Sequence, residues 1–148
     1  MTGVFNKLAE QHKEVAALLQ RCELADEPEK RKDLWSKIRV ELLSHEQGEL
    51  REVYPAFDKH VSLRDIVEEH ADDADLLEST IQEIDGIDFA SEAWPVALQR
   101  LITAVKQHAE EEEKEFFPRA QDVLGKNETK SLEERFLAAQ ESVKKKLR

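Results

Sequence analysis

Apolar side chains recur at every third or fourth position along almost the whole chain of 148 residues, and little of it alternates apolar and polar residues as strands do. With only four Gly and four Pro, few residues interrupt this helical pattern. Charged residues make up 37% of the sequence, enough to solvate the outer faces of long helices. The pattern therefore predicts an all-α fold.

Turn residues divide the pattern into four long helices and a shorter fifth one. The expected helices cover about residues 4–24, 28–54, 63–86, 94–124 and 127–147. Pro55 and Pro118 are expected to bend the second and fourth helices near their ends. We expect residues 1–148 to form a single domain: an antiparallel, up-down-up-down four-helix bundle over about 3–124, with the short additional C-terminal helix packed outside it.

Net charge, hydropathy and cysteine content indicate which partners and which cellular compartment to expect. The formal net charge is −11, which opposes binding to nucleic acids and to anionic membranes. No apolar run approaches the ~20 residues of a membrane span, and the N-terminal segment lacks the apolar core of a secretory signal. Cys22 has no partner for an internal disulfide, which fits a reducing compartment. We therefore expect a soluble, cytoplasmic protein with no nucleic-acid or membrane partner.

Four of the five histidines fall in line with the Leu, Ile and Val residues of the inner helix faces, one on each long helix: His12, His45, His70 and His108. A single His on an apolar face is usually a core residue with one hydrogen-bond partner. Four of them need a common explanation, because each buried imidazole requires a polar partner.

The second and fourth helices repeat one motif. The segments HEQGELREVYPAF and HAEEEEKEFFPRA both read His, three residues, Glu, four residues, aromatic, Pro. In this register Glu49 corresponds to Glu112, whereas Glu111 corresponds to Gly48. The shared position therefore indicates Glu112, and not Glu111, as the functional carboxylate of the fourth helix.

The spacing within the motif suits metal binding. Residues four apart lie on one helix face, so the His and the Glu of each copy can reach one ion together. Imidazole mixed with carboxylate fits iron or manganese better than a structural zinc, and the full set is too large for one tetrahedral site. Two ions, each with two His and sharing two carboxylates, use all six candidates. These ligands are His12, His45, Glu49, His70, His108 and Glu112.

The order of motifs, H, HxxxE, H and HxxxE, resembles the hemerythrin family in its bacterial HHE cation-binding branch, over about residues 8–118. The resemblance implies a non-haem centre of two iron ions joined by an oxo or hydroxo bridge. It also implies that Glu49 and Glu112 bridge the ions. The histidines of the first two helices would hold one iron, and those of the third and fourth helices the other.

Two departures from the oxygen-carrying hemerythrins bear on function. Those proteins have a second His one turn after the third-helix His, where this chain has Ala74, and His-x-x-x-x-Asp where it has His-x-x-x-Glu. The pattern instead resembles the branch with iron- and oxygen-sensing domains and di-iron proteins of the nitric oxide or peroxide stress response. We expect a protein that binds, senses or reacts with O2, NO or peroxide, as a weak oxidoreductase in the catalytic version. The alternative is an iron sensor or store without turnover.

Residues beside the ligands are candidates for supporting roles. If Pro55 pushes Tyr54 out of helical geometry, its phenolate can reach the iron left short of a ligand by Ala74; otherwise Tyr54 packs at the bundle end. Glu46 lies about 100° round the helix from the preceding His and is expected to be solvated or to sit just outside the ligands. Gly48 allows close helix approach or ligand access, or is simply tolerated.

Two other classes of helical protein fit less well. A ferritin-like oxidase carries Glu-x-x-His, whereas the residues three before the histidines are Ala9, Leu42, Val67 and Val105. A histidine phosphotransfer bundle needs one exposed His, whereas here several are predicted to face inward.

Overall fold

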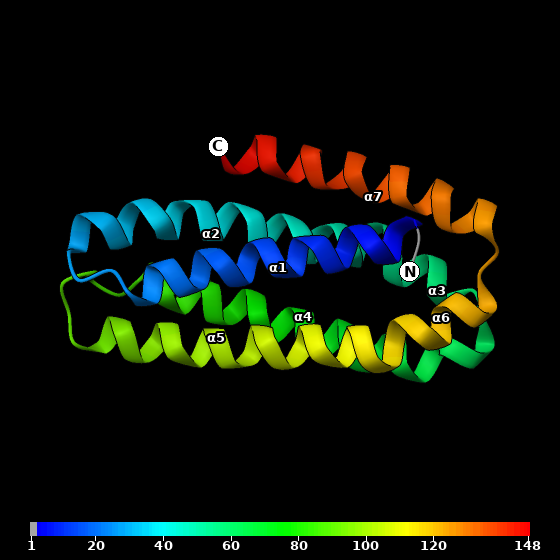
Figure 1. The fold of residues 1–148 in the computed structure, drawn as a ribbon, viewed down its shortest axis with the longest axis horizontal. Helices are drawn as coiled ribbons and strands as arrows, with labels where there is room; N and C mark the ends of the chain where they lie inside the picture. Colours follow the sequence, from blue (N-terminus) through cyan, green and yellow to red (C-terminus); the bar gives the residue numbers. More distant parts are fainter. Residues whose placement is uncertain (1–2) are drawn as a thin grey trace.

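The computed structural model describes residues 3–148, in which every regular element is helical (Figure 1). Met1 and Thr2, which the expected domain includes, lie outside the described residues. The four long helices are α1 Gly3–Glu23, α2 Pro28–Gly48, α4 Arg64–Asp85 and α5 Ala93–Glu111. They run antiparallel, with α1 packed against α2 and α5, and α4 packed against α5 and α2. The expected all-α four-helix bundle is confirmed.

Two of the long helices continue through a π-turn into a short helix. α2 leads through η1, Glu49–Val53, into α3, Tyr54–Asp58. α5 leads through η3, Glu112–Phe116, into α6, Phe117–Val123. Each copy of the sequence repeat thus starts its π-turn at the Glu and has its aromatic residue directly after the turn. A 3-10 turn, η2 Val61–Leu63, connects α3 to α4.

The prolines of the repeat explain the π-turns. Pro55 and Pro118 have no N–H to donate, and their rings would collide with the carbonyl four residues earlier in an α-helix. The wider π-turn relieves this: the Tyr54 N–H bonds to the Glu49 carbonyl, five residues back, and the second copy makes the equivalent bond. The expectation that Pro55 pushes Tyr54 out of helical geometry is therefore wrong, because Tyr54 has φ −62° and ψ −42°.

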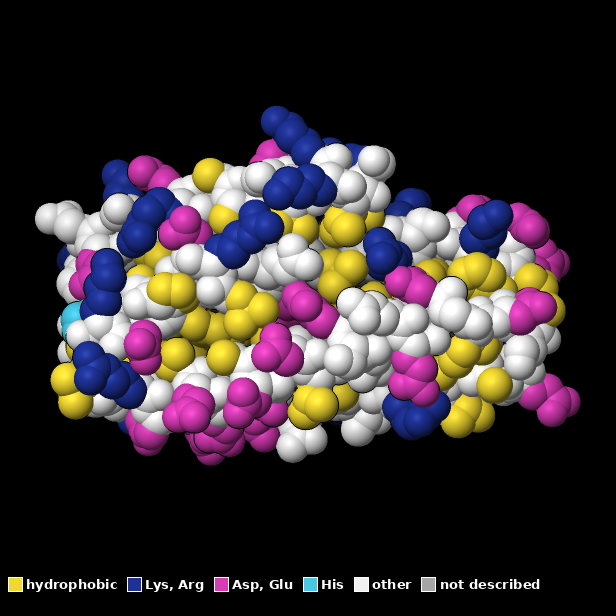
Figure 2. Space-filling model, turned by 180° about the vertical axis from the view of Figure 1, so that it is seen from behind, with side chains coloured by type: hydrophobic (Ala, Val, Ile, Leu, Met, Phe, Trp, Pro, Cys, Tyr) yellow, Lys and Arg dark blue, Asp and Glu magenta, His cyan; other side chains and the backbone are white. Residues whose placement is uncertain are grey.

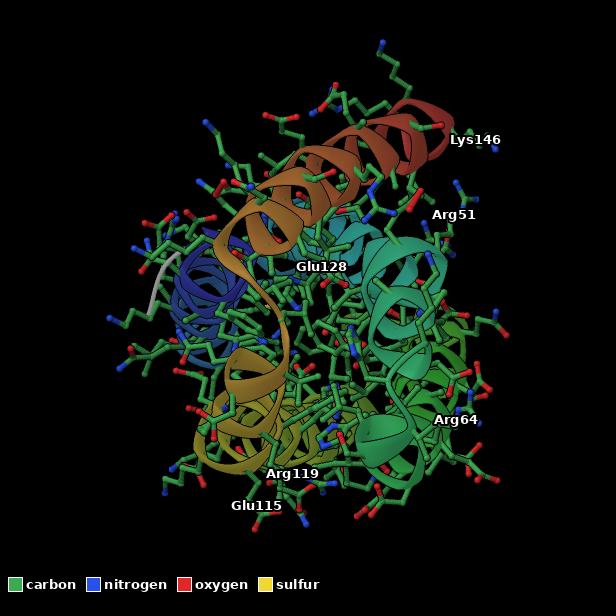
Figure 3. The ribbon with its side chains drawn as sticks, turned by 90° about the vertical axis from the view of Figure 1, so that its right-hand side faces the viewer. Arg51, Arg64, Glu115, Arg119, Glu128 and Lys146 are labelled. Carbon is green, nitrogen blue, oxygen red and sulfur yellow. The ribbon has the colours of Figure 1, made fainter. Side chains whose placement is uncertain are left out.

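The C-terminal helix α7, Lys126–Leu147, lies across α1 and α2, on the opposite side of the bundle from α4 and α5 (Figures 1 and 3). The residues that it buries recur every three or four positions: Thr129, Leu132, Phe136, Gln140 and Val143. Lys144 reaches Glu41 at 3.2 Å and Arg135 reaches Glu52 at 3.7 Å. In Figure 2, Lys and Arg side chains gather along the upper edge of the molecule, where α7 lies over α2.

The buried apolar residues form two clusters with a polar layer between them. One cluster, around Phe57 and Phe116, fills the end of the bundle that carries α3 and α6. The other, around Trp35 and Trp94, fills the end with the α1–α2 and α4–α5 loops. On α1, for example, His12 falls between residues of the first cluster and residues of the second. The polar layer is where the predicted ligands lie.

None of the helices in residues 3–148 has the length and the apolar character that crossing a lipid bilayer requires.

Candidate metal centre

The polar layer brings together side chains from all four long segments of the bundle. It contains every predicted ligand: His12 of α1, His45 of α2, Glu49 of η1, His70 of α4, His108 of α5 and Glu112 of η3. Glu49 and Glu112 are fully buried, and even the most accessible of the set, His12, has a side chain only 9% exposed. These polar groups therefore face one another inside the bundle and not bulk water.

The first group of side chains joins α1, α2 and the two π-turns. One ligand atom from each of its members lies within 4.8 Å of the others: His12, His45, Glu49 and Glu112. The Nε2 of His45 approaches Glu49 Oε1 to 2.8 Å, and the Nε2 of His12 lies 3.2 Å from Glu112 Oε1. The repeat spacing of four residues brings His45 and Glu49 together as expected for one helix face.

The second group lies beside the first and shares a carboxylate with it. His70, His108 and Glu112 have ligand atoms within the same 4.8 Å limit. The Nε2 of His108 is 3.5 Å from Glu112 Oε1, and the ring centroids of His70 and His108 are 5.2 Å apart. Phe116 stacks on His70 with a centroid separation of 4.7 Å and limits the orientations of that ring. Glu112 thus stands between the two histidine pairs.

Glu46 lies in the same layer. Only 2% of it is exposed, and its ligand atom groups with those of Glu49 and His108. Its Oε2 is 3.7 Å from the Nε2 of His108. The solvated alternative for Glu46 is therefore wrong, and the alternative of a place just outside the ligands stays a prediction. The helical-wheel argument failed because α2 packs against α1, α4 and α7 together, which buries more of its circumference than two neighbours would.

Several atoms of this layer have no hydrogen-bond partner among the described residues. They include His45 Nε2, Glu46 Oε2, both carboxylate oxygens of Glu49, His70 Nδ1, His108 Nε2 and Glu112 Oε1. His45 and Glu49 approach closely but without hydrogen-bond geometry, as two ligands directed at one point do. Unpartnered polar atoms are rare in protein interiors. Imidazole and carboxylate atoms arranged in this way fit metal ions of the iron and manganese type.

The charges of the polar layer also favour bound metal ions. Burial raises the pKa of Glu46 and Glu112, and the charge of Glu49 raises both further. Burial lowers the pKa of His45 to about 3. Burial alone would lower the pKa of His12 too, but the hydrogen bond and the charge of Glu112 raise it to about 9. Divalent cations among these groups would offset the mutual repulsion of the carboxylates.

Two of the histidines, His12 and His45, have hydrogen-bond partners for their outward nitrogens that sequence reasoning missed. His12 Nδ1 donates to Glu113 Oε2 at 2.9 Å, and His45 Nδ1 donates to Gln11 Oε1 at 2.8 Å. Such contacts orient imidazole rings and fix which nitrogen faces an ion. Their one sequence signal is position, because Gln11 precedes a ligand and Glu113 follows one. Many polar residues share such positions without this role.

Tyr54 and Ala74 are both buried close to the second group. The Tyr54 hydroxyl donates to Glu112 Oε2 at 3.1 Å, and burial together with the charge of Glu112 raises its pKa well above the usual value. Ala74 is fully buried and belongs to the same apolar cluster as Tyr54. The remaining histidine, His60, lies apart from the layer, 3.2 Å from Glu128 at the start of α7.

Two surface hollows reach the polar layer. One, of about 210 Å³ between α4 and α5, is lined by His108 and by polar residues that include Asp73 and Gln107. The other, of about 310 Å³ between α1 and α5, runs past aliphatic residues such as Val105 to His12. The two differ in polarity, and each ends at a different histidine of the layer.

Comparisons with known proteins point to one family. The sequence model of the hemerythrin HHE cation-binding domain matches residues 4–120. Among solved structures, the crystal structure of a hemerythrin HHE cation-binding domain-containing protein from Mycobacterium kansasii is similar, with a TM-score of 0.82 and 19% sequence identity over 99% of this chain and 90% of that one. At that identity the likeness shows the fold alone. No curated protein matches the sequence.

Proposed function

The chain belongs to the hemerythrin HHE cation-binding family, and from this premise we propose that it holds two iron ions in its polar layer and uses them to bind, sense or convert O2, NO or peroxide. The observation that carries the proposal is the set of buried imidazole and carboxylate atoms that have no hydrogen-bond partner among the described residues. A protein interior tolerates such atoms when they ligate a metal.

The ligand assignment follows the two groups. We assign His12 and His45 to the first ion and His70 and His108 to the second, with Glu49 and Glu112 shared between the ions. The position of Glu112 between both histidine pairs supports a bridging role.

Two further oxygen ligands complete the proposal, both at the second ion. Glu46 is buried near His108 with an unpartnered oxygen. The Tyr54 hydroxyl donates to Glu112. Tyr54 lies on the side of the second ion where Ala74 stands in place of a histidine, so the ion lacks a nitrogen ligand there. The second ion would then carry more oxygen ligands than the first, which favours its ferric form, because hard anionic oxygens prefer the harder ion.

The chain's own residues would shape the chemistry around such a centre. The ions, when bound, supply the redox and Lewis-acid chemistry. Phe116 and Phe117 are fully buried beside His70 and His12 and keep bulk water away from those rings. The hollow between α4 and α5 suits a polar reactant such as peroxide, and the more apolar hollow between α1 and α5 suits O2 or NO.

Metal analysis with an absorption spectrum tests the proposal. Protein purified without added metal should contain two iron atoms per chain and should absorb in the near-ultraviolet and visible range. The test variant is Glu49→Gln, which should lose iron. Its matched control is Glu52→Gln, a change at a half-buried residue three positions later that faces Arg135 of α7, which should keep its iron. One metal atom per chain, or zinc in place of iron, would contradict the proposal.

An iron sensor or store without turnover is the second candidate, and it uses the same ligands. The polar hollow beside His108 favours it, because Asp73 and Glu111 at its edge would attract a cation. A turnover measurement distinguishes an enzyme from a sensor or store. An enzyme consumes many equivalents of peroxide or NO per iron pair, whereas a sensor or a store changes its spectrum once and then stops.

A further inference from the structure

We propose that Gln140 of α7 is a positioning residue for the metal centre: acting through Gln11, it holds the His45 ring so that Nδ1 keeps the proton and Nε2 faces Glu49. The proposal rests on the proposed iron-binding function. It adds that α7, which lies beyond the residues 4–120 matched by the family, forms part of the centre.

Three buried side chains from three helices form the chain of contacts. His45 Nδ1 donates to Gln11 Oε1 at 2.8 Å. Gln11 and Gln140 then pair through both halves of their amides: Gln11 Nε2 donates to Gln140 Oε1 at 2.8 Å, and Gln140 Nε2 donates to Gln11 Oε1 at 2.9 Å. The exposed fractions of His45, Gln11 and Gln140 are 2%, 9% and 4%, so water does not substitute for these contacts.

The orientation of the Gln11 amide decides which nitrogen of His45 carries the proton. An ion takes the lone pair of one ring nitrogen, so the proton must stay on the other. With its oxygen toward His45, Gln11 keeps the proton on Nδ1 and leaves Nε2 free. With its amide reversed, Gln11 would donate to Nδ1, and the proton would move to Nε2, where it excludes the ion.

Gln140 removes the cost of the orientation of Gln11 that an ion requires. When the oxygen of Gln11 faces His45, the NH2 group of Gln11 points at α7 and needs an acceptor, which Gln140 Oε1 supplies. With an apolar residue at position 140, that orientation would leave a buried NH2 group unpaired. The reversed amide would leave only a carbonyl oxygen unpaired, a smaller penalty. Loss of Gln140 therefore shifts His45 toward the form that does not bind an ion.

Close packing of α7 against α2 places Gln140 near the metal centre. A Cβ atom on Gly48 would come within 2.7 Å of Phe136 Cε1, so only Gly lets α7 approach α2 this closely. The Phe136 ring also meets the His45 ring edge-on, with the centroids 5.9 Å apart. Gln140 lies one turn further along α7, which brings it level with His45. Both α7 side chains therefore bear on the same ligand.

The test compares two substitutions of Gln140 in the full-length protein. Gln140→Met removes both amide groups at similar volume, whereas Gln140→Glu keeps the acceptor that the NH2 group of Gln11 needs. Val143→Ala is the matched control, because it removes packing from the next buried position of α7. The readouts are the protonated nitrogen of His45, by 15N NMR of metal-free protein, and the affinity for Fe2+ in anaerobic titration.

We expect Gln140→Met to move proton occupancy from Nδ1 to Nε2 of His45 and to weaken Fe2+ binding about tenfold. Gln140→Glu should keep both properties, and so should Gln11→Glu/Gln140→Met, because a carboxylate at position 11 accepts from Nδ1 without help. Val143→Ala should lower the thermal midpoint and change neither readout. If Gln140→Met does not fold, Gln140→Asn, whose amide is one methylene too short, takes its place.

The proposal is overturned if the substitution at position 140 leaves the protonated nitrogen of His45 unchanged, or if Val143→Ala weakens Fe2+ binding as much. A wild-type protein that binds no Fe2+ would instead refute the proposed iron function. In that case the NMR comparison on metal-free protein still decides whether Gln140 sets the His45 proton.

Discussion

The Tyr54 hydroxyl donates a hydrogen bond of 3.1 Å to Oε2 of Glu112, and this bond joins the two π-turns across the core of the bundle. Tyr54 directly follows η1, and Glu112 begins η3. In a π-turn, residues five apart lie on one face, so Tyr54 points the same way as Glu49. In a regular α-helix it would be rotated well away. The proline that follows Tyr54 thus directs the phenol toward the polar layer by widening the turn before it.

Tyr54→Phe tests whether the phenolate binds iron. If Tyr54 ligates ferric iron, the wild-type protein should show a visible charge-transfer band that the variant lacks. The variant should keep its iron, because a Phe ring retains the stacking on Phe116 and all the proposed His and Glu ligands remain. Identical visible spectra for the two proteins would show that Tyr54 acts only as a hydrogen-bond donor. The lost hydrogen bond itself should reduce the free energy of unfolding by about 1 kcal/mol.

The register of the fourth long helix predicts opposite results for two adjacent residues. Glu112→Ala removes the carboxylate shared by both histidine pairs and should release most of the iron. Glu111→Ala should keep two iron atoms per chain, because the Glu111 carboxylate accepts a hydrogen bond from Gln107 at the surface and belongs to neither histidine group. Iron content and thermal midpoint check both variants. Equal iron loss from the two would mean that the shared carboxylate has been assigned to the wrong residue.

The sequence predicted those features that depend on spacing along one helix. The helical period, the His-x-x-x-Glu motifs and their repeat select six residues that the folded chain brings to one layer. The features that it missed depend on packing between helices. The burial of Glu46 follows from three neighbours around α2, and the role of Gln11 depends on a residue 129 positions away. The backbone conformation of Tyr54 was predicted wrongly, because a proline can be accommodated by a π-turn as well as by a bend.

Gly48→Ala should destabilise the protein although Ala favours helices. The new Cβ would lie 2.7 Å from the fully buried ring of Phe136, so the ring or α7 would have to shift. We expect a loss of about 1–3 kcal/mol in the free energy of unfolding, measured by urea titration. Phe136→Leu should recover part of that loss in the double variant. Gly125→Ala is the control: its Cβ meets nothing within 4 Å, so it should change stability by less than about 0.5 kcal/mol.

The metal-free protein should lose stability as the pH rises from 6.5 to 9. The pKa of His12 is raised from 6.5 to about 9, and burial raises the pKa of Glu46 and Glu112 above 4.5. Groups whose pKa is raised in the folded chain stabilise it fully below their unfolded pKa, and this stability disappears as the pH approaches the folded pKa. The pKa of His45 is lowered to about 3, so His45 makes the stability rise with pH instead of fall. This effect is confined to pH values below its unfolded pKa of 6.5.

Between pH 6.5 and 9 only the raised groups therefore matter, and the free energy of unfolding should fall by about 1–3 kcal/mol. Urea titrations of metal-free and iron-loaded protein at pH 6.5, 7.5 and 9 measure this. The iron-loaded protein should not show the decline, because bound ions hold these groups without protons. A metal-free protein whose stability rises over this range would contradict the charge distribution described for the layer.

The last prediction concerns reversible oxygen binding. Ala74 stands one turn after His70, where the oxygen-carrying hemerythrins have a histidine, and Tyr54 lies in the same buried cluster. A second ion with oxygen ligands in place of that nitrogen would hold its ferric state more tightly. Oxygen would then leave as hydrogen peroxide, taking one electron from each of the two ions and two protons from the solvent, and the ions would stay ferric. The wild-type protein should therefore not cycle between oxygen-bound and oxygen-free spectra.

Restoring the histidine should move the protein toward a carrier only when space is made for it. Ala74→His alone overfills a fully buried position and should cost about 1–3 kcal/mol of stability. Ala74→His/Tyr54→Ala removes the phenol, so the imidazole can reach the second ion, and spectra recorded over repeated cycles of O2 pressure should then show partial reversibility. Ala71→His, about 100° round α4 from His70, is the control and should leave the spectra unchanged. Lossless cycling by the wild-type protein would refute this reading, because the centre would then carry oxygen without the histidine.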